Sequence, residues 1–245
     1  MIPKAIHYCW FGRNPLPKLA LKCIASWRKF FPDYEIKEWN EDNFDVNIIP
    51  YTSEAYAAKK YAFVSDYARF WILYHYGGIY FDTDVEVIRP MDDIIAKGPF
   101  MGIEVPGLED KYPQINPGLG LGAEQGMPFY SGMMSLYDGL AFINDDGSHN
   151  TQTVVKYTTE ILVRAGLAKS DSEQTLEGIT IYPADFFNPM DSLTGKTVLS
   201  QNTRSIHLYM NSWSDKSSLY KWLSRLSHRL FGLFFHRVKS VIIEA

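Results

Sequence analysis

The sequence predicts one α/β domain over residues 1–215, followed by a basic amphipathic helical segment over residues 216–245. Three observations predict this organisation. First, the chain begins with a strand, a helix and a second strand. Second, its next helical stretch ends at a Gly-Gly pair, which a short apolar strand follows. Third, its last part repeats apolar residues at helical spacing. At 245 residues the chain is long enough to bury a sizeable core.

The first elements form a predicted βαβ unit. Residues 4–10 (KAIHYCW) are aromatic and apolar, and they run into Phe11-Gly12, which indicates a buried strand followed by a loop. Residues 17–31 place apolar side chains near a helical period. Residues 34–39 (YEIKEW) alternate between apolar and polar side chains, as a strand with one buried face does. This order favours parallel strands joined through a helix.

The middle of the chain predicts helices and then two short strands. Residues 54–76 contain few helix breakers and place apolar side chains near one face, so we expect one or two helices that end at Gly77-Gly78. Residues 79–81 then predict a short buried strand, and residues 85–88 a second extended piece.

Residues 98–129 are dense in glycine and proline, which predicts a long irregular segment. Such segments often line binding sites. Beyond this segment, the pattern predicts a helix over residues 151–167, a strand over 178–182 and a last short strand over 205–208.

The composition excludes several function classes. The net charge of -4, with basic residues gathered mainly at the C-terminal end, argues against a nucleic-acid partner. Cys9 and Cys23 are too few for a disulfide framework, so we expect a reducing compartment. We find neither a secretory signal nor a membrane-spanning apolar run, which predicts a cytoplasmic protein. The high aromatic share of 15% leaves rings available for binding flat or ring-shaped ligands.

The pair Asp82 and Asp84 in YGGIYFDTDV is the main candidate for chemistry. In an extended strand both side chains would project to one side, with Thr83 pointing away. Their mutual repulsion favours a hard divalent cation such as Mg²⁺ or Mn²⁺, whose open positions can take phosphate oxygens. The end of a strand in an α/β sheet is where ligands sit. The alternative is that the two aspartates cap a turn.

Asp66 and Arg69 form a second candidate pair. They lie three residues apart, on one face of the predicted helix, among apolar residues. Two interpretations remain open: a surface salt bridge, or a buried pair aimed at a sugar or a phosphate.

Four segments together resemble the DXD-containing sugar transferases of glycosyltransferase family 32, which include bacterial capsular-polysaccharide enzymes and yeast mannosyltransferases. They are residues 2–12 (IPKAIHYCWFG), 62–69 (AFVSDYAR), 77–84 (GGIYFDTD) and 206–213 (IHLYMNSW). The resemblance rests on their order, because no single motif is specific. It implies a GT-A fold, which is Rossmann-like and nucleotide-sugar-binding, with a mixed central sheet. It also implies Mn²⁺ or Mg²⁺ and a nucleotide-sugar donor, which we expect to be a UDP-sugar carrying a hexose or N-acetylhexosamine.

The same resemblance implies roles for individual residues. Trp10 would stack on the donor base, and Asp66 and Arg69 would hold the donor sugar. Asp82 would contact ribose or sugar, and Asp84 would bind the metal together with His207. Ser212 or Trp213 would close the site near the diphosphate. The expected catalytic residues are Asp66, Arg69, Asp82 and Asp84; the expected donor-binding residues are Trp10, Asp66, Arg69, Asp82, Asn116 and Trp213; the expected metal ligands are Asp84 and His207.

Some of these residues have a simpler interpretation. Without the family, Trp10 and His207 would be read as core residues, and Asn116 as part of a turn that also offers an amide to sugar hydroxyls. His7 is expected in the core.

The expected reaction is transfer with retention at the anomeric carbon. Negative charge grows on the departing nucleoside diphosphate, where a cation beside Asp84, with His207 and Arg69, would stabilise it. Retention requires either a covalent adduct on a carboxylate or attack of the acceptor from the side of the leaving group. The sequence offers no compelling nucleophile, so the front-side route is our preferred hypothesis.

The C-terminal segment (SSLYKWLSRLSHRLFGLFFHRVKSVIIEA) predicts an amphipathic basic helix. Two interpretations remain open: it packs on the domain, or it contacts an anionic membrane surface, where each basic residue contributes ~1 kcal/mol. The second interpretation fits a glycan or lipid-linked acceptor at the inner face of the membrane, in surface or capsular polysaccharide synthesis.

Two other classes satisfy part of the pattern. In a phosphatase of the haloacid dehalogenase type, Asp82 would be the nucleophile and Asp84 the acid/base. That class also needs a later G-D-x-x-x-D pair, which we do not find in the sequence. A non-catalytic sugar-binding module would need the metal site but no turnover.

Overall fold

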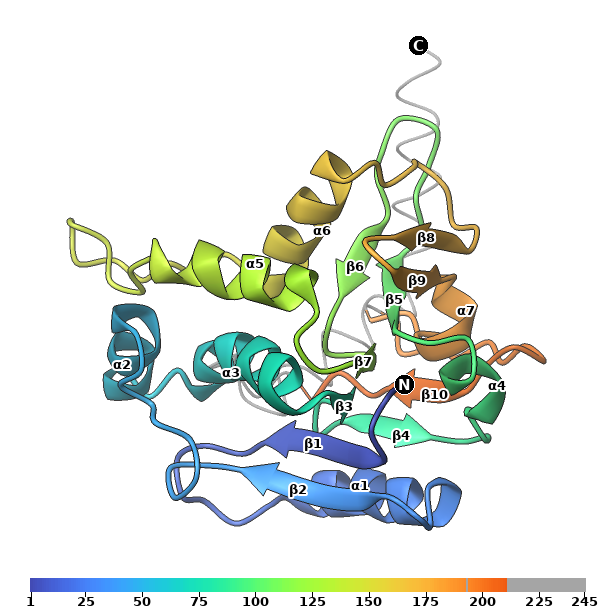
Figure 1. The fold of residues 1–245 in the computed structure, drawn as a ribbon, viewed down its shortest axis with the longest axis horizontal. Helices are drawn as coiled ribbons and strands as arrows, with labels where there is room; N and C mark the ends of the chain where they lie inside the picture. The colour runs from blue at the N-terminus through green and yellow to red at the C-terminus, as the bar shows by residue number, and fades with distance from the viewer. Residues whose placement is uncertain (193, 211–245) are drawn as a thin grey trace.

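The computed structural model describes residues 1–192 and 194–210, and these residues form an α/β fold around a mixed sheet (Figure 1). The order across the sheet is β2-β1-β3-β7-β5-β9-β8, with β6 paired to β5. Trp213, the domain boundary at residue 215 and the predicted helical segment over 216–245 lie outside the described residues. The strands of this sheet are β1 (Ala5–Cys9), β2 (Glu35–Trp39), β3 (Gly78–Tyr80), β5 (Phe100–Val105), β6 (Gln114–Asn116), β7 (Leu121–Ala123), β8 (Gln174–Leu176) and β9 (Ile179–Tyr182).

The predicted βαβ unit is confirmed. Helix α1 (Lys18–Phe30) joins β1 to β2, and the two strands are parallel, with Cys9 opposite Trp39. The chain then returns to β3, which lies parallel to β1 on its other side, with His7 opposite Tyr80. The order therefore reverses at β1. In open α/β sheets the crevice at the carboxyl ends of strands beside such a reversal is the usual ligand site.

The helical stretch before β3 is two helices, α2 (Pro50–Ala57) and α3 (Tyr61–Tyr76). Helix α2 begins earlier than the sequence pattern predicted, with Pro50 in its first turn, where a fixed φ and a missing N–H cost nothing. Helix α3 ends at Gly77, as expected, and the φ of 62° at Gly77 is a left-handed value that favours glycine.

The prediction of a long irregular segment over residues 98–129 is wrong. It contains β5, β6 and β7 and the start of helix α5 (Pro128–Asp138). The glycines here serve close packing within strands. A Cβ on Gly102 would lie 2.6 Å from the ring of Phe187, and one on Gly122 would overlap the ring of Phe100.

The remaining predicted elements are confirmed within a few residues. Strands β4 and β10 form a separate antiparallel pair, with Val85 opposite His207. The Thr153 side chain caps α6 by accepting the N–H of Lys156. The predicted elements are β4 (Val85–Val87), α6 (Val154–Arg164) and β10 (Ser205–His207), and the structure adds two short helices that the sequence pattern did not predict, α4 (Asp92–Ile95) and α7 (Ala184–Phe187).

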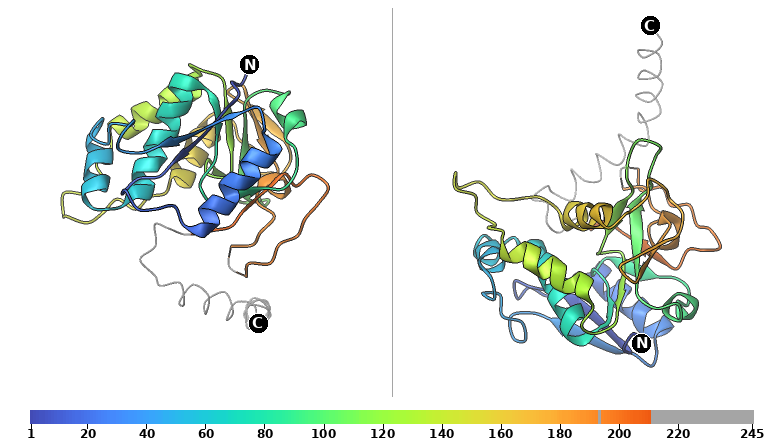
Figure 2. Two further views of the ribbon diagram at one scale, coloured as in Figure 1. Left: turned by 90° about the horizontal axis from the view of Figure 1, so that it is seen from below. Right: turned by 45° about the horizontal axis from the view of Figure 1, so that its top comes forward.

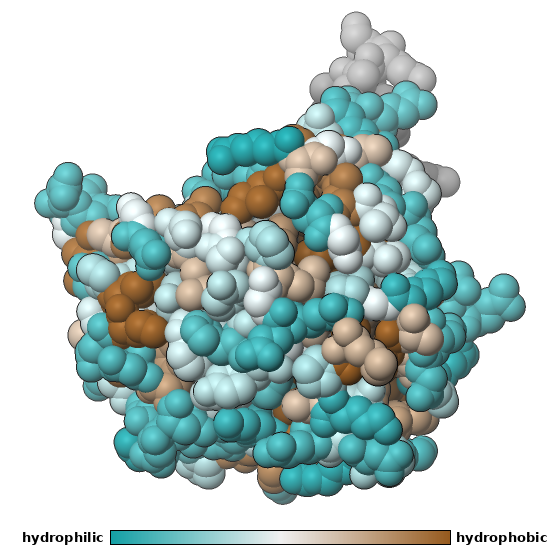
Figure 3. Space-filling view, viewed as in Figure 1, coloured by the Kyte–Doolittle hydropathy of each residue, from teal (hydrophilic) through white to brown (hydrophobic). Residues whose placement is uncertain are grey.

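Helices lie on both sides of the sheet (Figure 2), and the buried apolar residues form two cores. Because side chains alternate along a strand, Ile6 and Tyr8 of β1 pack toward α1, while Cys9 packs toward α3 and α5. Cys9 and Cys23 are both buried and free. None of the helices in the described residues has the length and apolar character needed to cross a bilayer. Hydrophilic side chains cover most of the lower part of the face shown in Figure 3.

His7 is buried, as expected, and it ties three elements together. The indole N–H of Trp39 donates to His7 Nδ1 at 3.1 Å, so Nε2 carries the proton and donates to the carbonyl of Gly77 at 3.1 Å. Burial, with Lys37 contributing, lowers the pKa of His7 to about 4 even though the bond to Gly77 opposes this. The imidazole is therefore neutral in the folded protein at neutral pH.

We expect His7 to make the fold acid-sensitive. The unfolded chain binds a proton at this imidazole near pH 6.5 and the folded chain only near 4, so stability is lost as pH falls through that window, by about 3 kcal/mol in total. His7→Gln should be less stable than the wild type at about pH 7, yet lose less stability on acidification. Urea unfolding across this range measures both. The exposed His149→Gln is the control, and equal slopes for wild type and His7→Gln would contradict the prediction.

Candidate active site

Asp82 and Asp84 converge, but not through strand alternation. Strand β3 ends at Tyr80, and the chain then turns, with the N–H of Val85 bonding the carbonyl of Asp82 at 3.1 Å. The prediction that both carboxylates project from an extended strand is therefore wrong in its geometry. A turn between β3 and β4 brings them together because the chain must reverse to reach β4.

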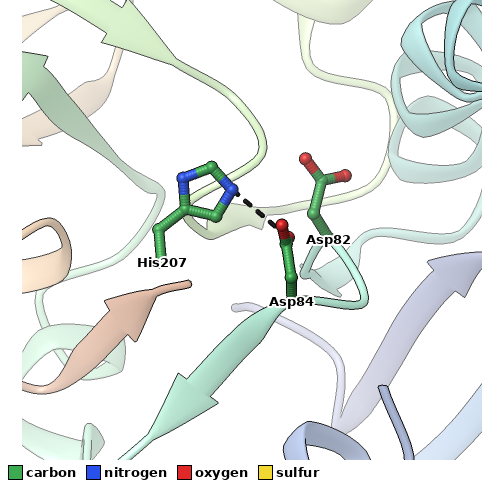
Figure 4. A group of neighbouring side chains, drawn as sticks. All are labelled: Asp82, Asp84 and His207. Carbon is green, nitrogen blue, oxygen red and sulfur yellow. Dashed lines mark ion pairs between the residues drawn. The ribbon is translucent and has the colours of Figure 1, made fainter. Parts of the chain in front are cut away.

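His207 completes a cluster with these two aspartates (Figure 4). One ligand atom from each of the three residues lies within 4.8 Å of the others, and no other group of this kind occurs in residues 1–192 and 194–210. His207 reaches the turn because β10 pairs with β4. Its Nε2 lies 3.2 Å from Asp84 Oδ1, and both residues are buried.

Asp84 and His207 stabilise each other's charged forms. Burial alone would lower the pKa of His207, but the nearby Asp84 outweighs burial and the pKa is raised, with smaller contributions from Asp82 and Glu104. Burial alone would raise the pKa of Asp84, but His207 and the N–H of Met210 outweigh it and the pKa is lowered. The Met210 N–H donates to Asp84 Oδ2 at 2.7 Å, which holds the carboxylate in one orientation.

The cluster suits a divalent cation. It offers hard carboxylate oxygens and one imidazole nitrogen, a donor set that Mn²⁺ accepts well and that Mg²⁺ also uses in part. Gly118 leaves room for the Asp82 carboxylate, because a Cβ there would overlap Asp82 Oδ2. The predicted ligands Asp84 and His207 are therefore together, and Asp82 lies with them.

Asp66 and Arg69 form a buried ion pair, which decides between the two interpretations of the sequence pattern. Arg69 Nη2 lies 2.8 Å from Asp66 Oδ1 and 3.4 Å from Asp82 Oδ1, so one guanidinium joins the helix to the turn. Burial raises the pKa of Asp66 to about 7, with Arg69 opposing and Asp82 adding to the rise. The Nη1 atom of Arg69 is buried without a hydrogen-bond partner among the described residues.

Tyr80 is a site residue that sequence reasoning missed. Its hydroxyl donates to Asp82 Oδ1 at 3.2 Å, and its ring lies under the Arg69 guanidinium, 5.1 Å from centre to centre. The sequence feature that could have identified Tyr80 is its position in the predicted buried strand, two residues before Asp82. Tyr80 therefore positions both Asp82 and Arg69.

Asn116 lies beside the cluster and makes the turn contact that the sequence suggested. Its Oδ1 accepts the N–H of Gly118 at 2.6 Å, which is a turn contact, and the carbonyl of Gly118 accepts the N–H of Asp82 at 3.1 Å. Asn116 is buried, and its contact with Gly118 places it near Asp82 at the same edge of the sheet. Whether it binds sugar stays a prediction.

Trp10 directly follows β1, at the same edge of the sheet as the turn after β3. It is half-buried, packs against the core beside α1, and donates its indole N–H to the carbonyl of Asn14 at 2.6 Å. Its stacking on a base stays a prediction. Ser212 and Trp213 lie outside the described residues.

Part of the chain is similar in sequence to a known protein family. Residues 17–101 match the family described as a glycosyltransferase sugar-binding region containing a DXD motif. The matched region includes Asp66, Arg69 and the pair Asp82 and Asp84. It does not include His207, which joins the cluster only in the folded chain.

Curated relatives match about two fifths of the chain. An inositol phosphoceramide mannosyltransferase 1 of Schizosaccharomyces pombe is 31% identical over 111 residues, which is 41% of this chain and 33% of that protein. Inositol phosphoceramide mannosyltransferase 3 of the same yeast is 34% identical over 98 residues, 38% of this chain and 27% of that protein. The matches thus span about a third or less of each relative.

Solved structures share the fold. A glycosyltransferase involved in glycosylation of the major capsid of PBCV-1 covers 89% of this chain and 97% of its own, with 13% identity and a TM-score of 0.52. The PaToxG glycosyltransferase covers 66% and 69%, with 18% identity and a TM-score of 0.50. The fold is GT-A, as the resemblance implied. The phosphatase alternative finds no support in these matches.

We expect Gly118→Ala to weaken metal binding. The added Cβ would overlap Asp82 Oδ2 and displace that carboxylate, which should reduce Mn²⁺ affinity by about tenfold or more. Titration calorimetry with Mn²⁺ measures the change. Gly132→Ala is the matched control, because its Cβ would meet nothing within 4 Å inside α5. Equal affinities of Gly118→Ala and wild type would contradict the assignment.

We expect Arg69→Met to destabilise the fold by about 3 kcal/mol or more, because it leaves Asp66 buried without its counter-charge. Urea unfolding at neutral pH measures the loss. Arg13→Met removes an exposed pair with Asp42 and should leave the free energy of unfolding nearly unchanged. A similar small effect from both variants would show that the buried pair does not stabilise the fold.

Proposed function

We propose that this chain is a metal-dependent glycosyltransferase that takes a sugar from a nucleotide-sugar donor and transfers it with retention at the anomeric carbon. The observation that carries the proposal is the convergence of Asp82, Asp84 and His207 at the carboxyl edge of the sheet, beside the reversal of strand order at β1. The match of residues 17–101 to a DXD glycosyltransferase region supports it.

In this proposal the metal ion and the diphosphate would lie at the turn after β3. Asp84 and His207 would hold the cation, and Asp82 would contact it or the ribose. A bound Mn²⁺ or Mg²⁺ supplies positive charge where the leaving diphosphate gains negative charge. Asp84 is suited to this role because the Met210 N–H and His207 fix its orientation before any ligand arrives.

Asp66 and Arg69 hold the donor sugar. Arg69 is fixed by two carboxylates and by the Tyr80 ring. Its buried Nη1 finds no hydrogen-bond acceptor among the described residues, so its N–H groups are left for a ligand. Such a pre-oriented donor suits a sugar hydroxyl or a phosphate oxygen. Burial keeps competing water away from the pair.

The state of the carboxylates favours front-side attack. Asp66 and Asp82 share the Arg69 guanidinium, and Asp84 would bind the metal ion, so each of the three carboxylates would face a positive charge. Carboxylates held in this way are poor nucleophiles compared with a free one. We therefore keep the route in which the acceptor approaches from the leaving-group side. A glycosyl adduct on any of these aspartates, detected by mass spectrometry, would overturn it.

The donor and acceptor are proposed only as classes. The names of the yeast relatives support a hexose such as mannose on the donor, and their inositol phosphoceramide supports a lipid-linked acceptor. We keep a UDP-sugar as the first expectation, with GDP-sugars tested beside it. The sequence resemblance alone suggests surface or capsular polysaccharide synthesis, at the inner face of a membrane and in the cytoplasm.

We expect nucleoside diphosphate release from one donor in a panel of UDP- and GDP-sugars, including a mannose donor. Release should require Mn²⁺ or Mg²⁺, stop with a chelator, and fall by about 100-fold or more in Asp84→Asn, which keeps the shape of the side chain but loses its charge. Coupled detection of the nucleoside diphosphate measures the rate. The exposed Asp110→Asn is the control and should match the wild type.

The outcomes separate the proposed function from its rivals. Metal-dependent release lost in Asp84→Asn supports a transferase. Binding of a nucleotide-sugar without release of diphosphate, even with added acceptors, would mean a sugar-binding module instead. Turnover that is unaffected by the chelator and by Asp84→Asn would refute the role assigned to the cluster.

A further inference from the structure

Glu104 is a carboxylate at the same edge of the sheet that the proposed mechanism leaves without a role. It lies near the end of β5, which runs parallel to β3 because both strands are antiparallel to β7. The pairing of β5 with β6 passes from Ile103 opposite Ile115 to Val105 opposite Gln114, so Glu104 is the extra residue of a β-bulge. Bulges beside active sites re-aim a side chain.

A hydrogen-bond network holds Glu104 in place. The Asn188 side-chain amide donates to the backbone carbonyl of Glu104 at 2.9 Å and to the hydroxyl of Tyr209 at 2.7 Å. The Glu104 carboxylate lies close to the Tyr209 hydroxyl, and burial together with this carboxylate raises the pKa of Tyr209. Asn188 itself is buried, directly after α7. Asn188 thus fixes the backbone of Glu104, and Tyr209 lies beside its carboxylate.

Tyr209 connects Glu104 to the metal cluster. Its ring lies 4.3 Å from the ring of His207, centre to centre. Its φ of 50° is left-handed and unfavourable for a tyrosine, and it persists because the flanking amides of Leu208 and Met210 both bond Asp84. Strain of this kind at a candidate active site is consistent with a geometry held for function.

Glu104 and the donor-sugar pair lie on different sides of the cluster. Asp66 and Arg69 belong to α3, which packs on β1 and β3, whereas Glu104 and Asn188 belong to β5 and the end of α7, which pack together. Glu104 is half-buried, so it is partly exposed at this edge of the sheet. A fixed, partly exposed carboxylate is a good acceptor for the hydroxyl protons of a sugar or polyol.

From this arrangement we propose that Glu104 binds a hydroxyl group of the acceptor, with Tyr209 and Asn188 as positioning residues that orient its carboxylate. The proposal rests on the proposed transferase function. It assigns Glu104 no covalent step: the carboxylate accepts a hydrogen bond from an acceptor hydroxyl and so fixes the reacting end of the acceptor near the donor. The acceptor class that it fits is a polyhydroxylated one, a sugar or an inositol.

The test separates transfer from donor hydrolysis, in which water replaces the acceptor. With the full chain, Mn²⁺ and the donor that the wild type turns over, transfer is measured to alkyl glycosides and to inositol phosphoceramide in detergent micelles. In Glu104→Gln we expect transfer, compared at kcat/KM for the acceptor, to fall about 10- to 100-fold further than donor hydrolysis. Tyr209→Phe should also weaken acceptor use, through a higher KM for the acceptor, but by a smaller factor than Glu104→Gln.

Controls keep these results interpretable. Glu109→Gln, an exposed carboxylate in the loop after β5, should behave as wild type in both reactions. Thermal unfolding of each variant shows whether it folds, and Glu104→Asp, which keeps the charge, should recover part of the transfer. Because hydrolysis needs no acceptor, a loss of hydrolysis in a folded Glu104→Gln would place Glu104 on the donor side and contradict the assignment even if no acceptor in the panel reacts.

Three outcomes would overturn the assignment. Equal losses of hydrolysis and transfer in a folded Glu104→Gln would place Glu104 on the donor side. Unchanged transfer would leave it without a role in acceptor binding. A covalent glycosyl adduct on Glu104 would make it a nucleophile instead. Failure of the transferase function itself is distinct, because the wild type would then release no diphosphate from any donor.

Discussion

Crowding of like charges at one edge of the sheet is the constraint on which this site depends. Asp66, Asp82 and Asp84 are brought together where burial makes an uncompensated carboxylate costly. Two side chains relieve this cost: the Arg69 guanidinium lies between Asp66 and Asp82, and the His207 imidazole lies beside Asp84. Arg69 joins α3 to the turn after β3, and His207 joins β10 to the same turn, so the contacts that balance the charge of the site also connect these elements.

The pairing of β10 with β4 shows how the fold completes the site. Val85 lies opposite His207, which places an imidazole from the end of the described chain against a carboxylate from its first half. The backbone of the same segment then returns to Asp84 through the amides of Leu208 and Met210. A loss of this strand pair would remove the imidazole from the cluster and leave the Asp84 carboxylate without its partner.

Small residues allow the antiparallel part of the sheet to approach this edge. Gly118 borders Asp82, and Gly102 and Gly122 lie against the rings of Phe187 and Phe100. A side chain at Gly118 would occupy the space of the carboxylate itself. The glycine density that suggested an irregular loop therefore reflects close packing, at Gly118 beside the site and at Gly102 and Gly122 within the sheet. The bulge at Glu104 lies in the same antiparallel part of the sheet.

Much of the architecture could be read from local pattern. The βαβ unit, the helix that ends at Gly77, the core position of His7 and the candidate pairs around residues 66–69 and 82–84 all follow from periodicity, breakers and charge in short windows. Periodicity did not reveal β5, β6 and β7, because short glycine-containing strands carry too few side chains to show alternation. Only the tertiary structure decided that a turn joins Asp82 to Asp84, that Arg69 bridges Asp66 and Asp82, and that Tyr80 and Glu104 belong to the same edge. These facts depend on contacts between residues far apart in the chain, and a local pattern contains no information about which distant side chain will meet it.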